Sequence, residues 1–306
     1  MRSNSGQKGT MKRFDRRNFL TSLAGGSAGL FAILQAKAGP SPDAPPQGTL
    51  GNTGITLSRI GQGTGMSGGN RQSNHTRMGF SKLVSLLQHD YDHGITFFDL
   101  ADLYGSHVYV REALRTIPRD KVAILTKLWF RYDGNPAEVP AAFKERSAKM
   151  ALERFRHELS TDYLDIVLMH CLDNPAWEEQ MRPYMDAMSE AKQKKQVRAV
   201  GVSCHNLGAL KVAAANPWVD VILARINPKG ARMDGPVDEV IAVLKQAKAN
   251  GKALIGMKIY GEGTLANMKE ECMRFARGLG LLDTMTLGAE SAEQMNESMN
   301  LYARVG

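Results

Sequence analysis

Short apolar runs rich in β-forming residues alternate with amphipathic segments eight times along this chain, which restricts the folds open to it. The expected strands are residues 59–63, 95–98, 122–126, 164–169, 197–202, 219–223, 253–257 and 284–287. The expected helices are residues 80–93, 108–116, 141–159, 177–195, 207–215, 237–250, 266–277 and 291–303. Strand-then-helix units build a parallel sheet, and eight units close that sheet into a barrel. We therefore predict the α/β class and a (β/α)8 TIM barrel.

The first 38 residues have the pattern of an export signal and are set apart from the fold. Arg16 and Arg17 match the twin-arginine pattern, residues 20–34 form a short apolar stretch, and residues 36–38 (AKA) fit a cleavage site. A stretch of about 15 residues is too short to span a bilayer comfortably. We predict export through the twin-arginine machinery, to the periplasm or otherwise out of the cytoplasm, without a stable membrane anchor.

Two further segments complete the predicted domain organisation. Residues 39–48 are rich in proline and are expected to be a linker. Residues 49–306 remain, and about 258 residues suit one barrel. The leader carries +6 of the formal net charge of +8, which leaves the rest of the chain near +2. Composition therefore gives no support for nucleic acid or an anionic membrane surface as a partner.

Four polar residues lie at or just after the ends of three neighbouring predicted strands: Asp99, Tyr104, Lys127 and His170. The carboxyl ends of barrel strands share one face, so these side chains are expected to converge there. A lysine that ends a buried strand needs a carboxylate partner, and Asp99 is available one strand away. We expect Lys127 to lower the pKa of Tyr104 and His170 to orient a substrate carbonyl. The set indicates an enzyme with a proton donor.

These four residues, including the five-residue offset from Asp99 to Tyr104, resemble the catalytic tetrad of the aldo-keto reductases. Residues 50–65 are similar to the N-terminal hairpin and first barrel strand of that family, and residues 126–129, 201–203 and 288–297 resemble other family motifs in the same order. The resemblance covers about residues 49 to 302. It implies an N-terminal β-hairpin, a nicotinamide dinucleotide cofactor, and a carbonyl substrate, with Tyr104 as the general acid.

The resemblance also implies where the cofactor binds. The positions expected to contact it, Asp99 included, lie at the ends of six predicted strands and in the last helix: Gly63, Thr64, Asp99, Ser203, Asn206, Met257, Lys258, Gly288, Glu290, Gln294 and Glu297. Two positions depart from the family pattern. Leu223 stands where many members have a glutamine for the nicotinamide amide, and Met257 stands where an aromatic ring usually stacks on the nicotinamide. Both departures favour weaker cofactor binding or altered specificity.

The adenosine end of the expected cofactor site leaves two dinucleotides open. Family members that bind NADP place basic residues in the last strand–helix loop, where this chain has Gly288, Glu290 and Gln294. A carboxylate repels a 2′-phosphate but accepts hydrogen bonds from a free 2′-hydroxyl. NADP(H) is the family default, and the charge of Glu290 makes NAD(H) a competitor.

Trp129 and Phe130 follow Lys127 and are expected to form an apolar wall that favours aldehydes and ketones over strongly charged substrates. Packing at the barrel rim is an equally good interpretation of both. No metal site is predicted, because Cys204 and His205 are adjacent and diverge. Cys171, Cys204 and Cys272 form neither a metal pair nor a disulfide framework, so buried thiols are expected.

The function predicted from the sequence is hydride transfer between a nicotinamide dinucleotide and an aldehyde, a ketone or the corresponding alcohol. One alternative is an exported dinucleotide-binding or sensing module on the same fold, with little reductase activity. Another is a metal-dependent barrel hydrolase, although the chain lacks a His-x-His ligand cluster.

Overall fold

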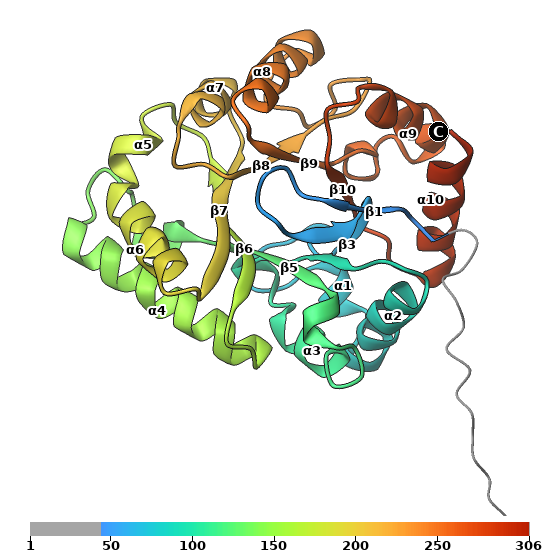
Figure 1. The fold of residues 1–306 in the computed structure, drawn as a ribbon, viewed down its shortest axis with the longest axis horizontal. Helices are drawn as coiled ribbons and strands as arrows, with labels where there is room; N and C mark the ends of the chain where they lie inside the picture. Colours follow the sequence, from blue (N-terminus) through green and yellow to red (C-terminus); the bar gives the residue numbers. More distant parts are fainter. Residues whose placement is uncertain (1–43, 306) are drawn as a thin grey trace, which may run out of the picture. The chain divides into compact units, whose positions relative to one another are not determined.

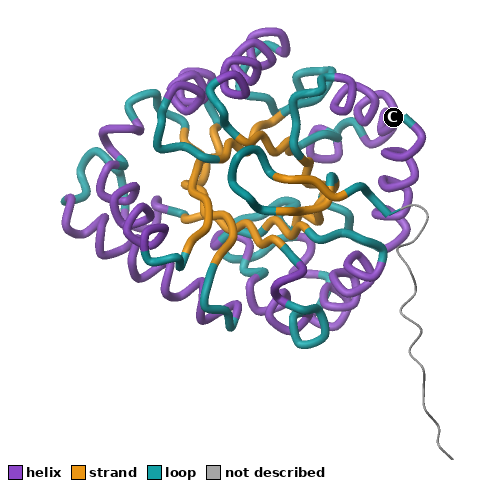
Figure 2. Tube along the Cα trace, viewed as in Figure 1, coloured by secondary structure: helices purple, strands orange, loops and turns teal. Residues whose placement is uncertain are grey.

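Eight parallel strands form a closed barrel in the order β10-β3-β4-β5-β6-β7-β8-β9, as the sequence predicts. The computed structural model of the protein describes residues 44–305, and Figure 2 shows the strands as an inner ring. The barrel strands are β3 (Ile60–Gly63), β4 (Phe97–Asp99), β5 (Ala123–Leu128), β6 (Leu164–Leu172), β7 (Val197–Cys204), β8 (Val221–Arg225), β9 (Ala253–Met257) and β10 (Thr284–Leu287). Each connection from strand to strand runs through the outside of the ring.

Helices surround the ring of strands (Figure 1). The longer helices are α2 (Phe80–Asp92), α3 (His107–Ala113), α4 (Ala141–Leu159), α6 (Arg182–Gln193), α7 (Leu207–Ala215), α8 (Val237–Ala249), α9 (Lys269–Gly278) and α10 (Ala292–Arg304). The short elements are α1 (Asn74–Arg77), α5 (Trp177–Gln180), η1 (Asp102–Tyr104), η2 (Arg119–Lys121), η3 (Phe130–Asp133), η4 (Gly261–Gly263) and η5 (Ala266–Met268).

The single helix predicted over residues 177–195 is wrong, because the chain forms α5 and then α6. Pro183 lies in the first turn of α6, where its missing N–H costs nothing. The same ring prevents that residue from continuing a helix that began at Trp177. Likewise, η5 precedes α9 within the segment predicted as one helix over residues 266–277.

A two-stranded hairpin precedes the barrel and corrects the boundary of the predicted linker. Strand β1 (Gln47–Thr49) pairs antiparallel with β2 (Thr56–Ser58), so Gln47 and Gly48 belong to the folded hairpin. The side-chain amide of Gln47 donates a hydrogen bond to the Gly94 carbonyl at 3.0 Å, which fastens this strand to the barrel. The predicted signal, residues 1–38, and the start of the linker lie outside the described residues.

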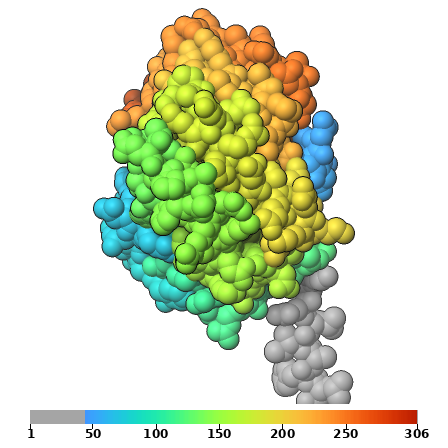
Figure 3. All heavy atoms as spheres, turned by 90° about the vertical axis from the view of Figure 1, so that its left-hand side faces the viewer, coloured from blue at the N-terminus to red at the C-terminus, as the bar shows by residue number. Residues whose placement is uncertain are grey.

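The hairpin closes one end of the barrel. Its side chains Leu50, Ile55 and Leu57 are fully buried and pack with inward-facing strand residues such as Phe97 and Leu125. Burying each such side chain stabilises the fold by about 1.5–3 kcal/mol. Figure 3 shows the hairpin, coloured blue, at one end of the molecule, with the helices α4 and α6 facing the viewer. The opposite end, where the strands finish, remains available for a site.

None of the helices between residues 44 and 305 combines the length and the apolar character that a membrane crossing requires.

Candidate functional site

The structure brings the four predicted polar residues together at the carboxyl ends of three adjacent strands. Asp99 ends β4, Lys127 lies in β5, His170 lies in β6, and Tyr104 ends the short helix η1 that follows β4. The buried Lys127 ammonium forms an ion pair with Asp99 and donates to the Leu100 carbonyl at 2.9 Å. A buried cation needs such partners, so β4 and β5 are joined at this point.

Tyr104 stands next to both the histidine and the lysine. Its hydroxyl lies 3.4 Å from Nε2 of His170, and the two rings meet edge to face with centroids 5.6 Å apart. Nζ of Lys127 lies 4.9 Å from the centroid of the Tyr104 ring. The geometry places the Tyr104 hydroxyl beside the His170 ring and the Lys127 cation over the Tyr104 ring.

The expectation that Lys127 lowers the pKa of Tyr104 is wrong for this structure. Burial raises the pKa of Tyr104 well above 10, and the nearby Asp99 carboxylate raises it further. The lysine does not reverse this, because its charge is paired with Asp99. Burial also holds the pKa of His170 well below 6.5, helped by the positive charge of Lys127. At neutral pH, Tyr104 is therefore protonated and His170 is neutral.

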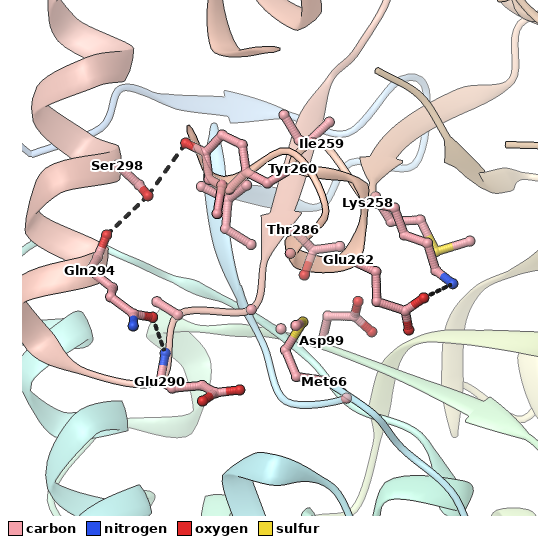
Figure 4. Close-up of a pocket in the computed structure, with 18 of the residues that line it drawn as sticks. Met66, Asp99, Lys258, Ile259, Tyr260, Glu262, Thr286, Glu290, Gln294 and Ser298 are labelled. Atoms are coloured by element: carbon pink, nitrogen blue, oxygen red, sulfur yellow. Dashed lines mark hydrogen bonds and ion pairs between the residues drawn. The ribbon is translucent and has the colours of Figure 1, made fainter. Parts of the chain in front are cut away.

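A groove begins at this cluster and runs along the mouth of the barrel toward α10. It has a volume of about 330 Å³ and is lined on its inner side by Asp99 and Tyr104. Figure 4 shows side chains from both ends of the groove, from Asp99 to Gln294 and Ser298. Of the predicted cofactor positions, the groove is lined by Gly63, Asp99, Met257, Lys258, Gly288, Glu290 and Gln294.

The lining of the groove combines apolar side chains with polar groups that a ligand could contact. Its walls carry a buried hydroxyl, Oγ1 of Thr286, that has no hydrogen-bond partner among residues 44–305. A Cβ at Gly288 would lie 2.6 Å from the Met66 side chain, so that part of the backbone must be glycine to keep the present packing. The first turn of α10, which begins at Ala292, borders the far end and presents backbone donors.

Four predicted cofactor residues lie outside the lining of this groove. Thr64 is buried, and its hydroxyl donates to the Asp99 carbonyl at 3.0 Å. The Asn206 side chain caps α7 by accepting from the Ala209 N–H at 3.0 Å, so it is not directed to the groove as a substitute for the family asparagine. The remaining two, Ser203 and Glu297, have protein partners as well: Ser203 accepts from the Cys171 N–H, and Glu297 pairs with Lys269.

Glu290 is held at the far end of the groove by two neighbours. Its carboxylate accepts a hydrogen bond from the Asn74 side chain at 2.8 Å, and its backbone N–H donates to Oε1 of Gln294 at 2.9 Å. Asn74 belongs to α1, in the loop between β3 and α2. The carboxylate is therefore fixed by a segment far from it in sequence, and one of its oxygens stays available to a ligand.

Sequence reasoning missed several residues that line the groove. Met66 comes from the loop after β3, and Tyr260, Glu262 and Lys269 come from the segment after β9. Lys269, which pairs with Glu297, places a cation in the lining of the groove. Four residues within 258–263 have left-handed backbone conformations, which make this segment a tight turn. In the sequence, only the two glycines at 261 and 263 indicated such a turn.

The two predicted substrate residues have different environments. Trp129 is half-buried, and its ring packs edge to face against His170 with centroids 5.3 Å apart. Phe130 is buried, with only 2% of its surface exposed, and packs against Tyr184. The wall prediction is therefore wrong for Phe130, which belongs to the core beneath the rim. Trp129 contacts His170 but is not among the residues that line the groove, so its role stays a prediction.

The cysteines are free thiols, as expected, although only Cys204 and Cys272 are buried. Cys171 is half-buried, and its Sγ lies 3.3 Å from Nε2 of His205. Within residues 44–305, no cluster of three or more His, Cys, Asp or Glu side chains is arranged to hold a metal ion.

The fold and the site define a TIM-barrel protein with an Asp–Tyr–Lys–His cluster beside a groove at the mouth of the barrel. The model of the aldo/keto reductase family matches residues 59–301. This match spans most of the sequence, and the chain belongs to the aldo/keto reductase family.

Curated relatives are distant. The NADH-specific methylglyoxal reductase of Escherichia coli is 28% identical over 189 residues, which are 58% of this chain and 58% of that protein. A probable aldo-keto reductase of Glycine max is 27% identical over 161 residues, 50% of this chain and 43% of the relative. The chain thus spans about half the length of the curated relatives it matches.

Solved structures share the fold over a larger part of the chain. A putative aldo-keto reductase from Pseudomonas aeruginosa superposes with a TM-score of 0.68 at 20% identity, covering 85% of this chain and 94% of that one. An aldo-keto reductase of Bombyx mori in complex with NADP gives a TM-score of 0.61 at 15% identity, covering 86% and 92%. At these identities the likeness concerns the fold.

Proposed function

We propose that this protein is an NAD(P)-dependent oxidoreductase that reduces an aldehyde or ketone, or oxidises the corresponding alcohol. The observation that carries the proposal is the Tyr104 hydroxyl, 3.4 Å from His170 and beside the Lys127–Asp99 pair, at the inner end of the groove. Family membership and the NADH-specific reductase among the relatives support it.

Each residue of the cluster has its own role in the proposed reduction. A bound reduced nicotinamide supplies the hydride to the carbonyl carbon. Tyr104, protonated at neutral pH, donates its proton to the carbonyl oxygen. Neutral His170 offers Nε2 as a hydrogen-bonding partner that orients the same oxygen. Lys127 stabilises the phenolate that forms on Tyr104, and Asp99 holds the lysine in place.

The residues that line the groove are those proposed to hold the dinucleotide. Gly63 and Gly288 allow close approach of backbone, and Met257 offers a polarisable surface at the nicotinamide end. At the adenosine end, the fixed carboxylate of Glu290 is proposed to accept hydrogen bonds from a 2′-hydroxyl, which favours NAD(H). Lys269 is a countercharge at that end, but it is engaged by Glu297.

A second candidate is a dinucleotide-binding or sensing module with little reductase activity. It is favoured by Leu223, which is fully buried and offers no hydrogen bond, and by the commitment of Asn206 to the α7 cap. Purified protein with NADH or NADPH and a panel of aldehydes and ketones separates the two. Consumption of dinucleotide that depends on the carbonyl supports the oxidoreductase; tight dinucleotide binding without consumption supports the module.

We also propose that the protein acts after export through the twin-arginine machinery, from the pattern at Arg16 and Arg17. This pathway carries folded proteins, which suits an enzyme that binds its cofactor in the cytoplasm. A small carbonyl compound is the proposed partner of the site.

A further inference from the structure

We propose that the natural substrate is a carbonyl compound that carries a carboxylate, and that Arg225 binds this carboxylate. The inference rests on the proposed reductase function and names the substrate class of the same site. It replaces the expectation, drawn from Trp129 and Phe130, that the pocket disfavours charged substrates.

Arg225 projects into the mouth of the barrel. It is the last residue of β8, two positions after Leu223, whose side chain belongs to the inner core of the barrel together with Val221. Side chains two apart on a strand share a face, so Arg225 faces inward at the carboxyl end. In the sheet it is in register with Met257, a residue that lines the groove.

The guanidinium of Arg225 is only partly used by the protein. Its Nε and Nη2 both donate to one oxygen of Asp234, Oδ1, and the other oxygen of that buried carboxylate has no partner among the described residues. Nη1 of Arg225 makes no hydrogen bond to another described residue, and it is not among the buried unpaired atoms. The Nη1 side of the guanidinium is therefore open to a ligand, while Asp234 fixes the side formed by Nε and Nη2.

The surroundings of Arg225 connect it to the catalytic cluster. Strand β6 has a register irregularity between Met169 and Leu172, and Cys171 there has a φ of 60°. This bulge directs Cys171, the neighbour of His170, toward His205, with Sγ 3.3 Å from Nε2. The positive charge of Arg225 acts on both side chains of this contact.

Two further cations surround the same contact. Arg131 lies over the Trp129 ring at 6.0 Å from its centroid, and Lys258 follows β9 in the wall of the groove. Arg131 pairs with Asp173, and Lys258 pairs with Glu262. Burial and the charges of Arg225, Lys258 and Arg131 together lower the pKa of His205 to about 3. Each of these cations has a carboxylate partner, so a bound anion would be held by the free Nη1 of Arg225 and not by an excess of positive charge.

A carboxylate fits these donors better than a bulkier anion. A planar guanidinium with one free edge matches a planar carboxylate, and such charged hydrogen bonds are among the strong ones. Trp129 packs on His170, beside which the carbonyl of the same molecule would lie. The substrate is thus oriented at both ends, by Arg225 and by the pair Tyr104 and His170.

The test compares two aldehydes that differ only in charge, 4-formylbenzoate and its methyl ester. The full-length protein is assayed with each, and kcat/KM for the acid is divided by that for the ester. We expect a ratio above one for the parent. The double variant Arg225→Gln/Asp234→Asn removes the ion pair without leaving a buried unpaired charge, and it should lower the ratio about tenfold or more.

Two single variants sharpen the design. Asp234→Asn frees the guanidinium from its carboxylate and should raise the ratio above that of the parent. Lys229→Gln removes an exposed cation of the same loop, paired with Glu271, and should leave the ratio unchanged. Circular dichroism and melting temperature verify that each variant is folded. If the parent prefers the ester, or the ratio is the same in the double variant, the inference is overturned and Arg225–Asp234 only holds the loop.

A binding measurement keeps this inference distinct from the reductase function. Benzoate and benzamide are titrated by calorimetry into the protein mixed with saturating NAD, which requires no turnover. Tighter binding of benzoate that disappears in the double variant supports the anion site even if neither aldehyde is reduced, in which case the proposed function alone fails. Equal binding of benzoate and benzamide contradicts the site, whatever the activity.

Discussion

The buried pair of Lys127 and Asp99 sets the chemistry of Tyr104 at the residue scale. Burial and the Asp99 carboxylate raise the pKa of Tyr104 well above 10, and the lysine, paired with Asp99, does not lower it, so the resting tyrosine keeps its proton. The same ammonium, 4.9 Å from the centroid of the ring, is positioned to stabilise the phenolate once the proton has left. In the proposed mechanism, Lys127 therefore stabilises the charge that develops during the reaction more than it stabilises the ground state.

Tyr104→Phe tests the assignment of the proton donor. The variant keeps the ring that packs on His170 and removes the hydroxyl, so carbonyl reduction should fall by about 10²-fold or more. Dinucleotide affinity, measured by fluorescence titration, should change little. Reduction at close to the parent rate would show that another group donates the proton.

Glu290→Arg tests the preference between the two dinucleotides. Two unit charges roughly 5 Å apart repel by about 3 kcal/mol at an effective dielectric of about 20, and a third of that changes relative affinity about fivefold. The variant should therefore raise the affinity ratio of NADP to NAD about fivefold or more. Titrations of both dinucleotides into the parent and the variant measure this ratio.

Glu293→Arg is the matched control for that experiment. It changes the net charge equally in the first turn of α10, but Glu293 does not line the groove. Its ratio should stay at the parent value. Equal shifts in both variants would mean that overall charge, and not the position of Glu290, controls the preference.

Individual residues differed in how far the sequence could predict them. Asp99, Tyr104, Lys127 and His170 follow or lie in strongly apolar strands, so the barrel geometry alone predicts that they converge. The environments of Phe130 and Asn206 were predicted wrongly. A shift of one residue along the chain decides whether an aromatic side chain packs at the rim or in the core, and whether an asparagine faces the groove or caps a helix. Arg225 was predictable in principle from the two-residue period of β8, whereas the contact between Asn74 and Glu290 depends on tertiary packing.

At the scale of elements, the loop between β3 and α2 connects the turn that carries Tyr104 to the far end of the groove. Gly105, with a φ of 67°, lies so close to this loop that a Cβ would be 2.1 Å from the Arg71 carbonyl. The Arg71 guanidinium donates to Asp102, the first residue of η1, at 2.8 Å. Asn74 of the same loop binds Glu290, so one segment holds both the tyrosine turn and the carboxylate.

Helix α4 also holds the turn that carries Tyr104, through Arg154 and Glu158. Arg154 donates to both oxygens of Asp102, and Glu158 contacts Arg71, Arg154 and His107. Burial raises the pKa of Glu158, but the His107 hydrogen bond and the charge of Arg154 outweigh it and lower the pKa to about 2. The ionised carboxylate therefore stabilises the fold.

Glu158→Gln should show this contribution in the pH dependence of stability. A folded-state pKa below the ordinary value of about 4.5 means that the stabilisation is present above pH 4.5 and is lost as the pH falls toward about 2. The parent should be more stable than the variant at pH 6, by about 1–3 kcal/mol, and the difference should shrink by pH 3. Urea unfolding at both values measures it; a gap that does not depend on pH would contradict the depressed pKa.

At the scale of the whole molecule, the hairpin and the groove lie at opposite ends of one barrel. The eight strand–helix units were predictable, because buried parallel strands and amphipathic helices have distinct periods. The exact boundaries were less so: Gln47 joins β1 although prolines precede it, and Pro183 divides one predicted helix. Both depend on where the chain meets the barrel, which local composition does not encode.

Replacement of Arg16 and Arg17 by lysine tests the proposed export of the whole molecule. Both residues lie in the proposed leader and precede the residues of the barrel in sequence, so the double variant should fold and bind dinucleotide as the parent does. Cell fractionation should find it in the cytoplasm with the leader attached. Mature protein outside the inner membrane, starting near Gly39, would contradict the twin-arginine route.

The most direct measurement of the central claim follows a labelled hydride. NADH or NADPH carrying deuterium at C4 of the nicotinamide is mixed with the protein and 4-formylbenzoate, and the products are examined by mass spectrometry. We predict one deuterium on the carbinol carbon of the alcohol, with formation of that product reduced about 10²-fold or more in Tyr104→Phe. Dinucleotide that binds without passing deuterium to this or any other aldehyde or ketone would contradict the account.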